Sequence, residues 1–276
     1  PLPEPPAIAP YRRFRLGEAT VTPLLAGNRP LENPHGPFGL NASAEDFADV
    51  SAAARIPADK SLNFFTPTLV DIGSEVVLFD TGLAPEGITA ALTAAGRSPD
   101  EVTLVVLTHM HGDHIGGLSD GTTPTFAKAR YATGQIEFDH WAGAGNEGFE
   151  AKVRPLADKM AMLADGAEAA PGLSALLVPG HTPGHMAYRV ESGGQSLILA
   201  ADTANHYIWS LGHPDWEVRF DMDKAQAAAS RRRLLDMLAA DGTPFVGYHM
   251  PFPGLGYVET AGEGFRFVPA SYQLDL

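Results

Sequence analysis

A run of three imidazoles and one carboxylate follows directly on an apolar stretch that ends at Leu107. These side chains stand in the pattern His-x-His-x-Asp-His and belong to His109, His111, Asp113 and His114. A helix or a strand would spread them in several directions, whereas a tight loop with the three glycines of this segment turns them toward one point. Imidazole nitrogens and carboxylate oxygens are metal ligands, so the segment predicts a metal site. Four ligands at so short a spacing favour two ions rather than one.

Three further candidate ligands each follow another predicted strand. They are His185, Asp202 and His249, which come after apolar runs that end at residues 178, 201 and 248. In open α/β sheets, functional side chains gather beyond the carboxyl ends of the strands. The chain has no cysteine, so any metal must be held by histidines and carboxylates. We therefore expect these residues to join the first four in one metal centre.

The elements that must position these residues are short apolar runs separated by helical patterns. The runs are rich in Val, Ile and Leu, which predicts buried strands at residues 68–72, 75–79, 102–107, 173–178, 196–201 and 244–248. Helices are expected over residues 85–95 and 224–240, the second with Asp223 as N-cap and Gly242 beyond its end. Residues 143–171 indicate helix and loop, and residues 231–233 a solvated basic face. Strands that alternate with helices indicate an α/β architecture.

Composition excludes several classes of function. The chain has 276 residues, of which 45% are hydrophobic, and we expect residues 1–276 to form one domain with residues 1–35 as an N-terminal arm and first strand. The formal net charge of −14 argues against nucleic acid or an anionic membrane as a partner. No segment has the roughly 18 to 20 consecutive apolar residues of a membrane-spanning helix. A small neutral substrate fits this chain better.

The complete ligand pattern resembles that of the dinuclear hydrolases of the metallo-β-lactamase superfamily, from about Val70 to the C-terminus. The resemblance implies an αββα sandwich, in which two mixed β-sheets are flanked by helices. It also implies one metal on His109, His111 and His185, a second on Asp113, His114 and His249, and Asp202 bridging the two with a hydroxide. Zinc is the expected metal, with manganese, iron or cobalt as alternatives.

Further roles follow from the same resemblance. Asp80 matches an aspartate that orients a metal ligand, and His181 is expected to stabilise its loop without binding metal. Asp113 and Asp202 are the candidate catalytic residues, because either carboxylate could move a proton to the leaving group. Two metal ions would polarise the substrate and activate water for hydrolysis.

Within the superfamily, the chain resembles the branch of methyl parathion hydrolases and aryl-lactone hydrolases. The similarity lies in residues 11–17, 249–256 and 264–269. It implies a hydrolase of small neutral lactones or esters that forms a homodimer. It also implies export, so a periplasmic or secreted protein that has lost a leader is favoured over a cytoplasmic one.

Two alternative activities stay open, together with one alternative of another class. The first is hydrolysis of organophosphate triesters, which the same site geometry would support. The second is hydrolysis of acyl-homoserine lactones, although such lactonases have a Tyr three residues after the bridging aspartate, where this chain has Asn205 and places Tyr207 two positions later. The other class is a metal-binding protein without hydrolytic activity, which the intact ligand set opposes.

The substrate pocket is harder to predict. Trp141 matches a tryptophan that faces the leaving group in the organophosphate branch, and it is expected to line an aromatic pocket. Phe64 and Phe65 precede the strand at residue 68 and are equally consistent with pocket or core. His206 lies on the loop after Asp202 and is a candidate for substrate contact, with a loop-stabilising role as the alternative.

Overall fold

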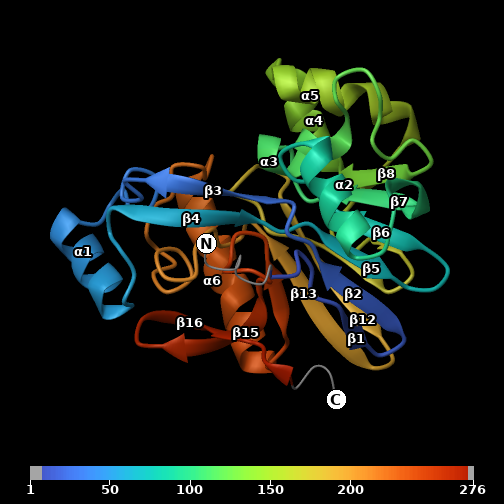
Figure 1. Ribbon diagram of the computed structural model, residues 1–276. Coiled ribbons are helices and arrows are strands. Elements are labelled where there is room, and N and C mark those ends of the chain that lie inside the picture. The colour runs from blue at the N-terminus through green and yellow to red at the C-terminus, as the bar shows by residue number, and fades with distance from the viewer. Residues whose placement is uncertain (1–7, 273–276) are drawn as a thin grey trace, which may run out of the picture.

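A computed structural model describes residues 8–272 as two seven-stranded sheets packed face to face, with helices on the outer faces (Figure 1). Both sheets are mixed: strands β6 to β9 of the first sheet pair in parallel, as do β13 and β14 of the second, and the other pairs are antiparallel. The predicted αββα sandwich is confirmed. Residues 1–7 of the predicted N-terminal arm lie outside the described residues.

The first sheet contains, in spatial order, β1 (Phe14–Leu16), β2 (Ala19–Pro23), β5 (Thr68–Asp71), β6 (Val76–Phe79), β7 (Leu104–Leu107), β8 (Arg130–Gly134) and β9 (Met160–Leu163). The second contains β10 (Glu168–Ala170), β11 (Leu173–Leu177), β12 (Met186–Ser192), β13 (Gln195–Ala201), β14 (Phe245–Gly247), β15 (Leu255–Ala261) and β16 (Gly264–Pro269). A separate hairpin pairs β3 (Gly27–Glu32) with β4 (Lys60–Phe65).

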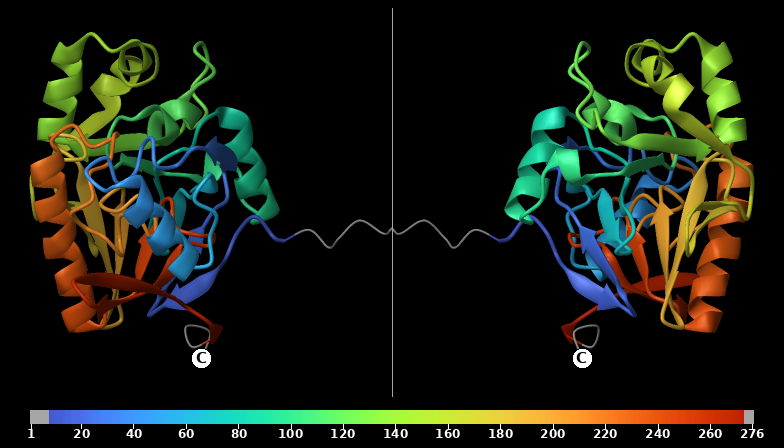
Figure 2. Two further views of the ribbon diagram at one scale, coloured as in Figure 1. Left: turned by 90° about the vertical axis from the view of Figure 1, so that its left-hand side faces the viewer. Right: turned by 90° about the vertical axis from the view of Figure 1, so that its right-hand side faces the viewer.

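The helices are α1 (Ala44–Ala53), α2 (Pro85–Ala94), α3 (Gly112–Ile115), α4 (Gln135–Ala144), α5 (Glu147–Lys152) and α6 (Lys224–Asp241), with 3₁₀ turns at Pro99–Glu101, Gly116–Leu118 and Arg154–Lys159. Figure 2 shows α2 and α6 on opposite outer sides of the sandwich. Among the described residues, no helix is both long and apolar enough to cross a membrane.

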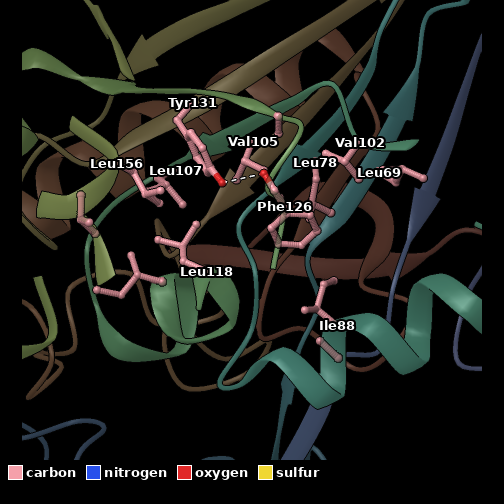
Figure 3. Close-up of a cluster of buried hydrophobic side chains, with 14 of the residues drawn as sticks. Leu69, Leu78, Ile88, Val102, Val105, Leu107, Leu118, Phe126, Tyr131 and Leu156 are labelled. Atoms are coloured by element: carbon pink, nitrogen blue, oxygen red, sulfur yellow. Dashed lines mark hydrogen bonds between the residues drawn. The ribbon is translucent and has the colours of Figure 1, made fainter. Parts of the chain in front are cut away.

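Strand β7 shows how the sequence builds these layers. All four of its residues are buried, and because alternate side chains of a strand point to opposite faces, they serve two cores. Leu104 and Val106 pack between the sheets, whereas Val105 and Leu107 pack under the helices that cover the first sheet. Figure 3 shows this outer core, in which the Tyr131 hydroxyl donates a 2.8 Å hydrogen bond to the Phe126 carbonyl. The continuous apolar run is therefore a strand buried on both faces.

All six predicted strands and both predicted helices are present. Asp223 caps α6 by accepting a hydrogen bond from the Gln226 backbone, and Gly242 ends the helix at a φ of 63°, which favours glycine. Two predictions are wrong in part. Residues 143–171 include strands β9 and β10 besides helix and loop, and residues 14–32 form three strands instead of one.

Candidate metal centre

Three imidazoles from two loops converge on one point. His109 and His111 lie on the loop between β7 and α3, and His181 lies on the loop between β11 and β12. His109 Nε2 is 3.1 Å from His111 Nδ1, which is 2.9 Å from His181 Nε2. Three nitrogens this close cannot all be satisfied by protons shared among themselves, whereas a cation between them would engage one lone pair of each.

A second group of side chains surrounds the carboxylate of Asp202. Its Oδ1 is 3.1 Å from His114 Nε2, and its Oδ2 is 3.1 Å from His249 Nε2 and 3.3 Å from His181 Nε2. His249 Nε2 also lies 3.3 Å from Asp113 Oδ2. Asp202 therefore contacts residues of both groups, as a ligand shared by two ions would.

The chemistry of these side chains fits divalent cations. His114 Nε2 and Asp202 Oδ1 are buried and have no hydrogen-bond partner with suitable geometry. Burial alone would lower the pKa of His249, but Asp202 and Asp113 raise it to about 10. Burial, reinforced by His181, lowers the pKa of His111 to about 4 and so leaves its ring neutral with a free lone pair. The carboxylates favour positive charge, and the neutral imidazoles provide ligand nitrogens.

Asp80 contacts the first loop and one of the candidate ligands on it. Its carboxylate accepts hydrogen bonds from the Thr108 backbone at 2.8 Å and from the Thr108 hydroxyl at 2.7 Å, and it lies 2.8 Å from His114 Nδ1. The backbone of Asp80 adopts a φ of 61°, which is costly for a residue other than glycine. The conformation places the carboxylate against Nδ1 of His114, where it orients the ring of this candidate ligand.

A second carboxylate, which no pattern in the sequence indicates, supports His181. His181 Nδ1 lies 2.8 Å from Asp221 Oδ1, whose other oxygen accepts a 2.7 Å hydrogen bond from Arg231. Arg231 also donates to the carbonyls of Thr203 and Pro214 and is only 1% exposed. The prediction of a solvated basic face at residues 231–233 is therefore wrong for Arg231, which faces a buried anion.

The structure contradicts the expected roles of His185 and His181. His185 Nδ1–H donates to the Val178 carbonyl at 3.2 Å, and its Nε2 accepts from the Asp202 backbone at 3.1 Å. Both ring nitrogens thus have backbone partners, which leaves no lone pair for a metal. His181, expected only to stabilise its loop, instead joins His109 and His111 in a possible ligand group. A signal existed in the sequence, because His181 lies four residues nearer to the strand end.

Glu137 on α4 connects the two loops. Its buried carboxylate accepts hydrogen bonds from the Met110 backbone, the Trp141 indole, the Thr182 hydroxyl and the Gly184 backbone, at 2.7 to 3.0 Å. A side chain at position 184 would lie 2.1 Å from the Glu137 nitrogen, so this loop requires glycine. Burial raises the pKa of Glu137, and the four donors oppose that rise. Nothing in the sequence distinguishes this residue from the other acidic residues of the helix.

Trp141 does not line the pocket as predicted. Its side chain is buried in the core under the first sheet, and its indole lies edge-on behind the His111 ring at 5.9 Å between centroids. Its Nε1–H donates to Glu137 and so is not available to a substrate. Trp141 therefore supports the loop of His111 instead of facing a leaving group.

A cavity of about 540 Å³ opens on the candidate ligands. Among the residues that line it are Phe38, Phe65, Asn205 and Phe220, and Phe65 is edge-on to His249 at 5.6 Å between ring centroids. Strands β3 and β4 form one wall, and Figure 1 shows this hairpin extending away from the sandwich toward α1. Phe65, for which the sequence left pocket and core equally open, is buried and also lies in the wall of this cavity.

A second cavity of about 420 Å³ lies on the other side of β4 and also reaches His249. Phe64 and His206 line this second cavity. His206 stacks on Trp209 at 3.9 Å between ring centroids, and its Nδ1 accepts hydrogen bonds from the Ile208 and Trp209 backbones. His206 therefore stabilises its loop and also contributes to a cavity wall.

Residues 66–249 match the pattern that describes the Metallo-beta-lactamase superfamily. A probable metallo-hydrolase, YybB of Bacillus subtilis, is 32% identical over 42% of this chain and 52% of its own. An N-acyl homoserine lactonase of Bacillus cereus is 26% identical over 43% of this chain and 45% of its own. The matches thus span about half the length of these curated relatives.

Two solved structures share the fold over almost the whole chain. The first is the dizinc quorum-quenching lactonase AidC, in complex with the product N-hexanoyl-L-homoserine. It has a TM-score of 0.87 at 25% identity, and the superposition covers 95% of this chain and 98% of AidC. The hydrolase AbOPH has a TM-score of 0.89 at 21% identity and covers 97% and 99%.

Proposed function

Because the chain belongs to the metallo-beta-lactamase superfamily, we propose that it is a metal-dependent hydrolase and, more narrowly, a two-metal lactonase. One observation carries the proposal: the Asp202 carboxylate lies within 3.3 Å of nitrogens of His114, His249 and His181, and so connects two groups of candidate ligands. Such an arrangement suits two ions that share one carboxylate. Zinc is the metal we expect, since the ligands are imidazoles and carboxylates.

The residues divide as follows in this proposal. His109, His111 and His181 hold one ion, Asp113, His114 and His249 hold the other, and Asp202 is shared. His181 thus takes the place that the sequence analysis assigned to His185. The two ions would polarise the ester carbonyl and supply a nucleophile from water at neutral pH.

The two candidate catalytic carboxylates have different surroundings. Asp202 is 3% exposed, and its oxygens contact three histidines and Asn205. The side chain of Asp113 is 23% exposed and lines the cavity of about 540 Å³. Asp113 is therefore the carboxylate positioned to pass a proton to the leaving oxygen, whereas Asp202 fixes the positions of the three histidine rings that it contacts.

The cavity suits an ester that carries an apolar group. Its aromatic residues offer an apolar surface, and its volume accommodates a lactone ring with an attached acyl chain. Lactones with an acylamino group are favoured among the substrates because the named relatives include an N-acyl homoserine lactonase and AidC. Simple aryl lactones and phosphotriesters are the competing substrates, and a homodimer is the expected assembly.

The test combines metal analysis with a substrate panel. We expect the purified protein to contain about two metal ions per chain, to hydrolyse an acylated homoserine lactone, and to lose this activity reversibly with a chelator. Dihydrocoumarin and a p-nitrophenyl phosphotriester serve as the competing substrates. Activity on the phosphotriester without activity on either lactone would overturn the proposal, as would turnover that survives removal of the metal.

A further inference from the structure

Tyr248 connects the second sheet to the short helix α3, which carries two of the candidate ligands. It follows β14 directly and is 4% exposed. Its hydroxyl donates a 2.5 Å hydrogen bond to the backbone carbonyl of Asp113. Its ring stacks on the ring of His114, with 3.9 Å between centroids and 28° between the planes. Because the next residue along the chain is His249, Tyr248 contacts or adjoins every member of one candidate ligand group.

Helix α3 depends on partners from outside because it is only one turn long. The last carbonyls of a helix have no partner within the helix. In a longer helix, the carbonyl of Asp113 would accept a hydrogen bond from the N–H of Gly117. That N–H donates instead to the carbonyl of Gly82 at 3.1 Å, and the carbonyl of Asp113 accepts from Tyr248. The tyrosine hydroxyl therefore fixes the backbone at a candidate ligand.

Other donors hold the same segment from the side of the first sheet. Thr81, two residues after β6, donates from its backbone and from its hydroxyl to the carbonyl of His114, both at 2.8 Å. Lys152 of α5 donates to the carbonyl of Gly116 at 2.6 Å. Among these donors, Tyr248 alone belongs to the second sheet. Its contact therefore sets the distance between α3 and the segment that follows β14.

We propose that Tyr248 is a positioning residue that sets the affinity of the ion held by Asp113, His114 and His249. The proposal rests on the two-metal part of the proposed function and concerns one of its two ions. Two of these three ligands lie on α3, and the third comes from the other sheet. An ion between them needs a fixed separation, and the hydroxyl and ring of Tyr248 provide it.

The other ion depends on different contacts. Glu137 fixes the two loops that carry His111 and His181. Asp221 lies 2.8 Å from Nδ1 of His181 and orients its ring. A change at Tyr248 should therefore weaken one ion and leave the other in place.

The test measures the zinc occupancy of each ligand group separately. Crystals of the natural protein and of Tyr248→Phe are equilibrated with a series of buffered zinc concentrations, and anomalous diffraction gives the occupancy of each group. Phenylalanine keeps the stack on His114 but lacks the hydroxyl. The free zinc that half-fills the group of Asp113, His114 and His249 should rise by about tenfold, and by less than about twofold for the other group. Tyr248→Leu, which also lacks the ring, should raise it by about 100-fold.

Tyr131→Phe is the matched control. Tyr131 is also buried, and its hydroxyl donates to the carbonyl of Phe126 in the core under the first sheet (Figure 3). Loss of this hydrogen bond should lower the stability of the fold about as much as Tyr248→Phe does, which urea denaturation measures. Neither zinc occupancy should change in this control.

The difference between the two ions decides the proposal. Unchanged zinc occupancy in Tyr248→Phe would overturn it, as would equal losses of both ions or the same loss in Tyr131→Phe. If the natural protein holds two ions, these outcomes remove only the role of Tyr248. If the natural protein holds no ion on Asp113, His114 and His249, the two-metal function fails as well.

Discussion

The two sides of the candidate metal centre are built differently. One side is local: it consists of the loop that follows β7 and the short helix α3, which together carry His109, His111, Asp113 and His114. His181, Asp202 and His249 come from three segments that follow strands β11, β13 and β14 of the second sheet. The first side is defined by local sequence, whereas the second exists only when distant segments fold together.

The supports of the two sides differ in the same way. On the loop side, Asp80 contacts Thr108 and His114 through a single carboxylate. On the side built from the second sheet, His181 depends on Asp221, which depends in turn on Arg231. Changes on the second side should therefore act through packing and charge as well as through the metal.

The largest effect is expected from replacing His181, the first of the two histidines in the loop between β11 and β12. His181→Gln removes a ligand nitrogen, so the metal content should fall toward one ion per chain. The value of kcat/KM should fall by more than about 100-fold, which is the upper limit for replacing a residue that only contacts a ligand. His185→Gln is the matched control, because an amide can donate to Val178 and accept from Asp202, and it should keep both ions. Elemental analysis and lactone hydrolysis decide, and the opposite pattern would restore His185 as the ligand.

Arg231→Met should destabilise the protein by about 3–5 kcal/mol, because Asp221 would remain buried without its cation. The matched control is Arg232→Met, whose ion pair with Asp215 lies at the surface and should contribute less than about 1 kcal/mol. Urea denaturation of the metal-bound protein measures both. Equal effects of the two changes would show that the buried pair does not support the second side.

The difference between the two sides also explains what the sequence could predict. Strand β7 is recognisable because Leu104 to Leu107 are all apolar, and α6 because Asp223 and Gly242 mark its ends. The ligands of the loop side are recognisable because their spacing is short and followed by glycines. Asp80 was found only through the family resemblance.

The second side could be predicted only in part. Asp202 and His249 follow their strands directly, but the loop after β11 contains two histidines, and its path depends on Glu137 from α4. The burial of Arg231 depends on Asp221, which comes from an irregular segment with no periodic pattern. Spacing along the chain carries no information about such contacts, because they form only in the folded protein.

Glu137 joins the two sides, so its replacement should affect both. In Glu137→Gln one oxygen becomes an NH₂ group that faces N–H and O–H donors, and the loops of His111 and His181 must shift. We expect metal affinity to fall by about 10- to 100-fold, as for other residues behind metal ligands. Asp139→Asn, exposed on the same helix, is the control. Competition with a chromophoric chelator measures the affinity, and an unchanged value would mean that the loops hold their positions without this carboxylate.

The smallest effect concerns acid stability on the second side. Burial lowers the pKa of His206 to about 3, so between this value and the ordinary pKa of about 6.5 the unfolded chain binds a proton that the folded protein does not. Stability due to neutral His206 is therefore full above about pH 6.5 and is lost as the pH falls.

His206→Asn isolates this contribution. The asparagine oxygen can still accept from the Ile208 and Trp209 backbones, but the side chain does not titrate. Between pH 7.5 and 5, the variant should lose about 2 kcal/mol less stability than the natural protein, because every other titrating group is common to both. Urea denaturation at the two pH values measures the difference. Parallel losses in the two proteins would mean that folding does not lower the pKa of His206, and that the second side gains no acid sensitivity from this residue.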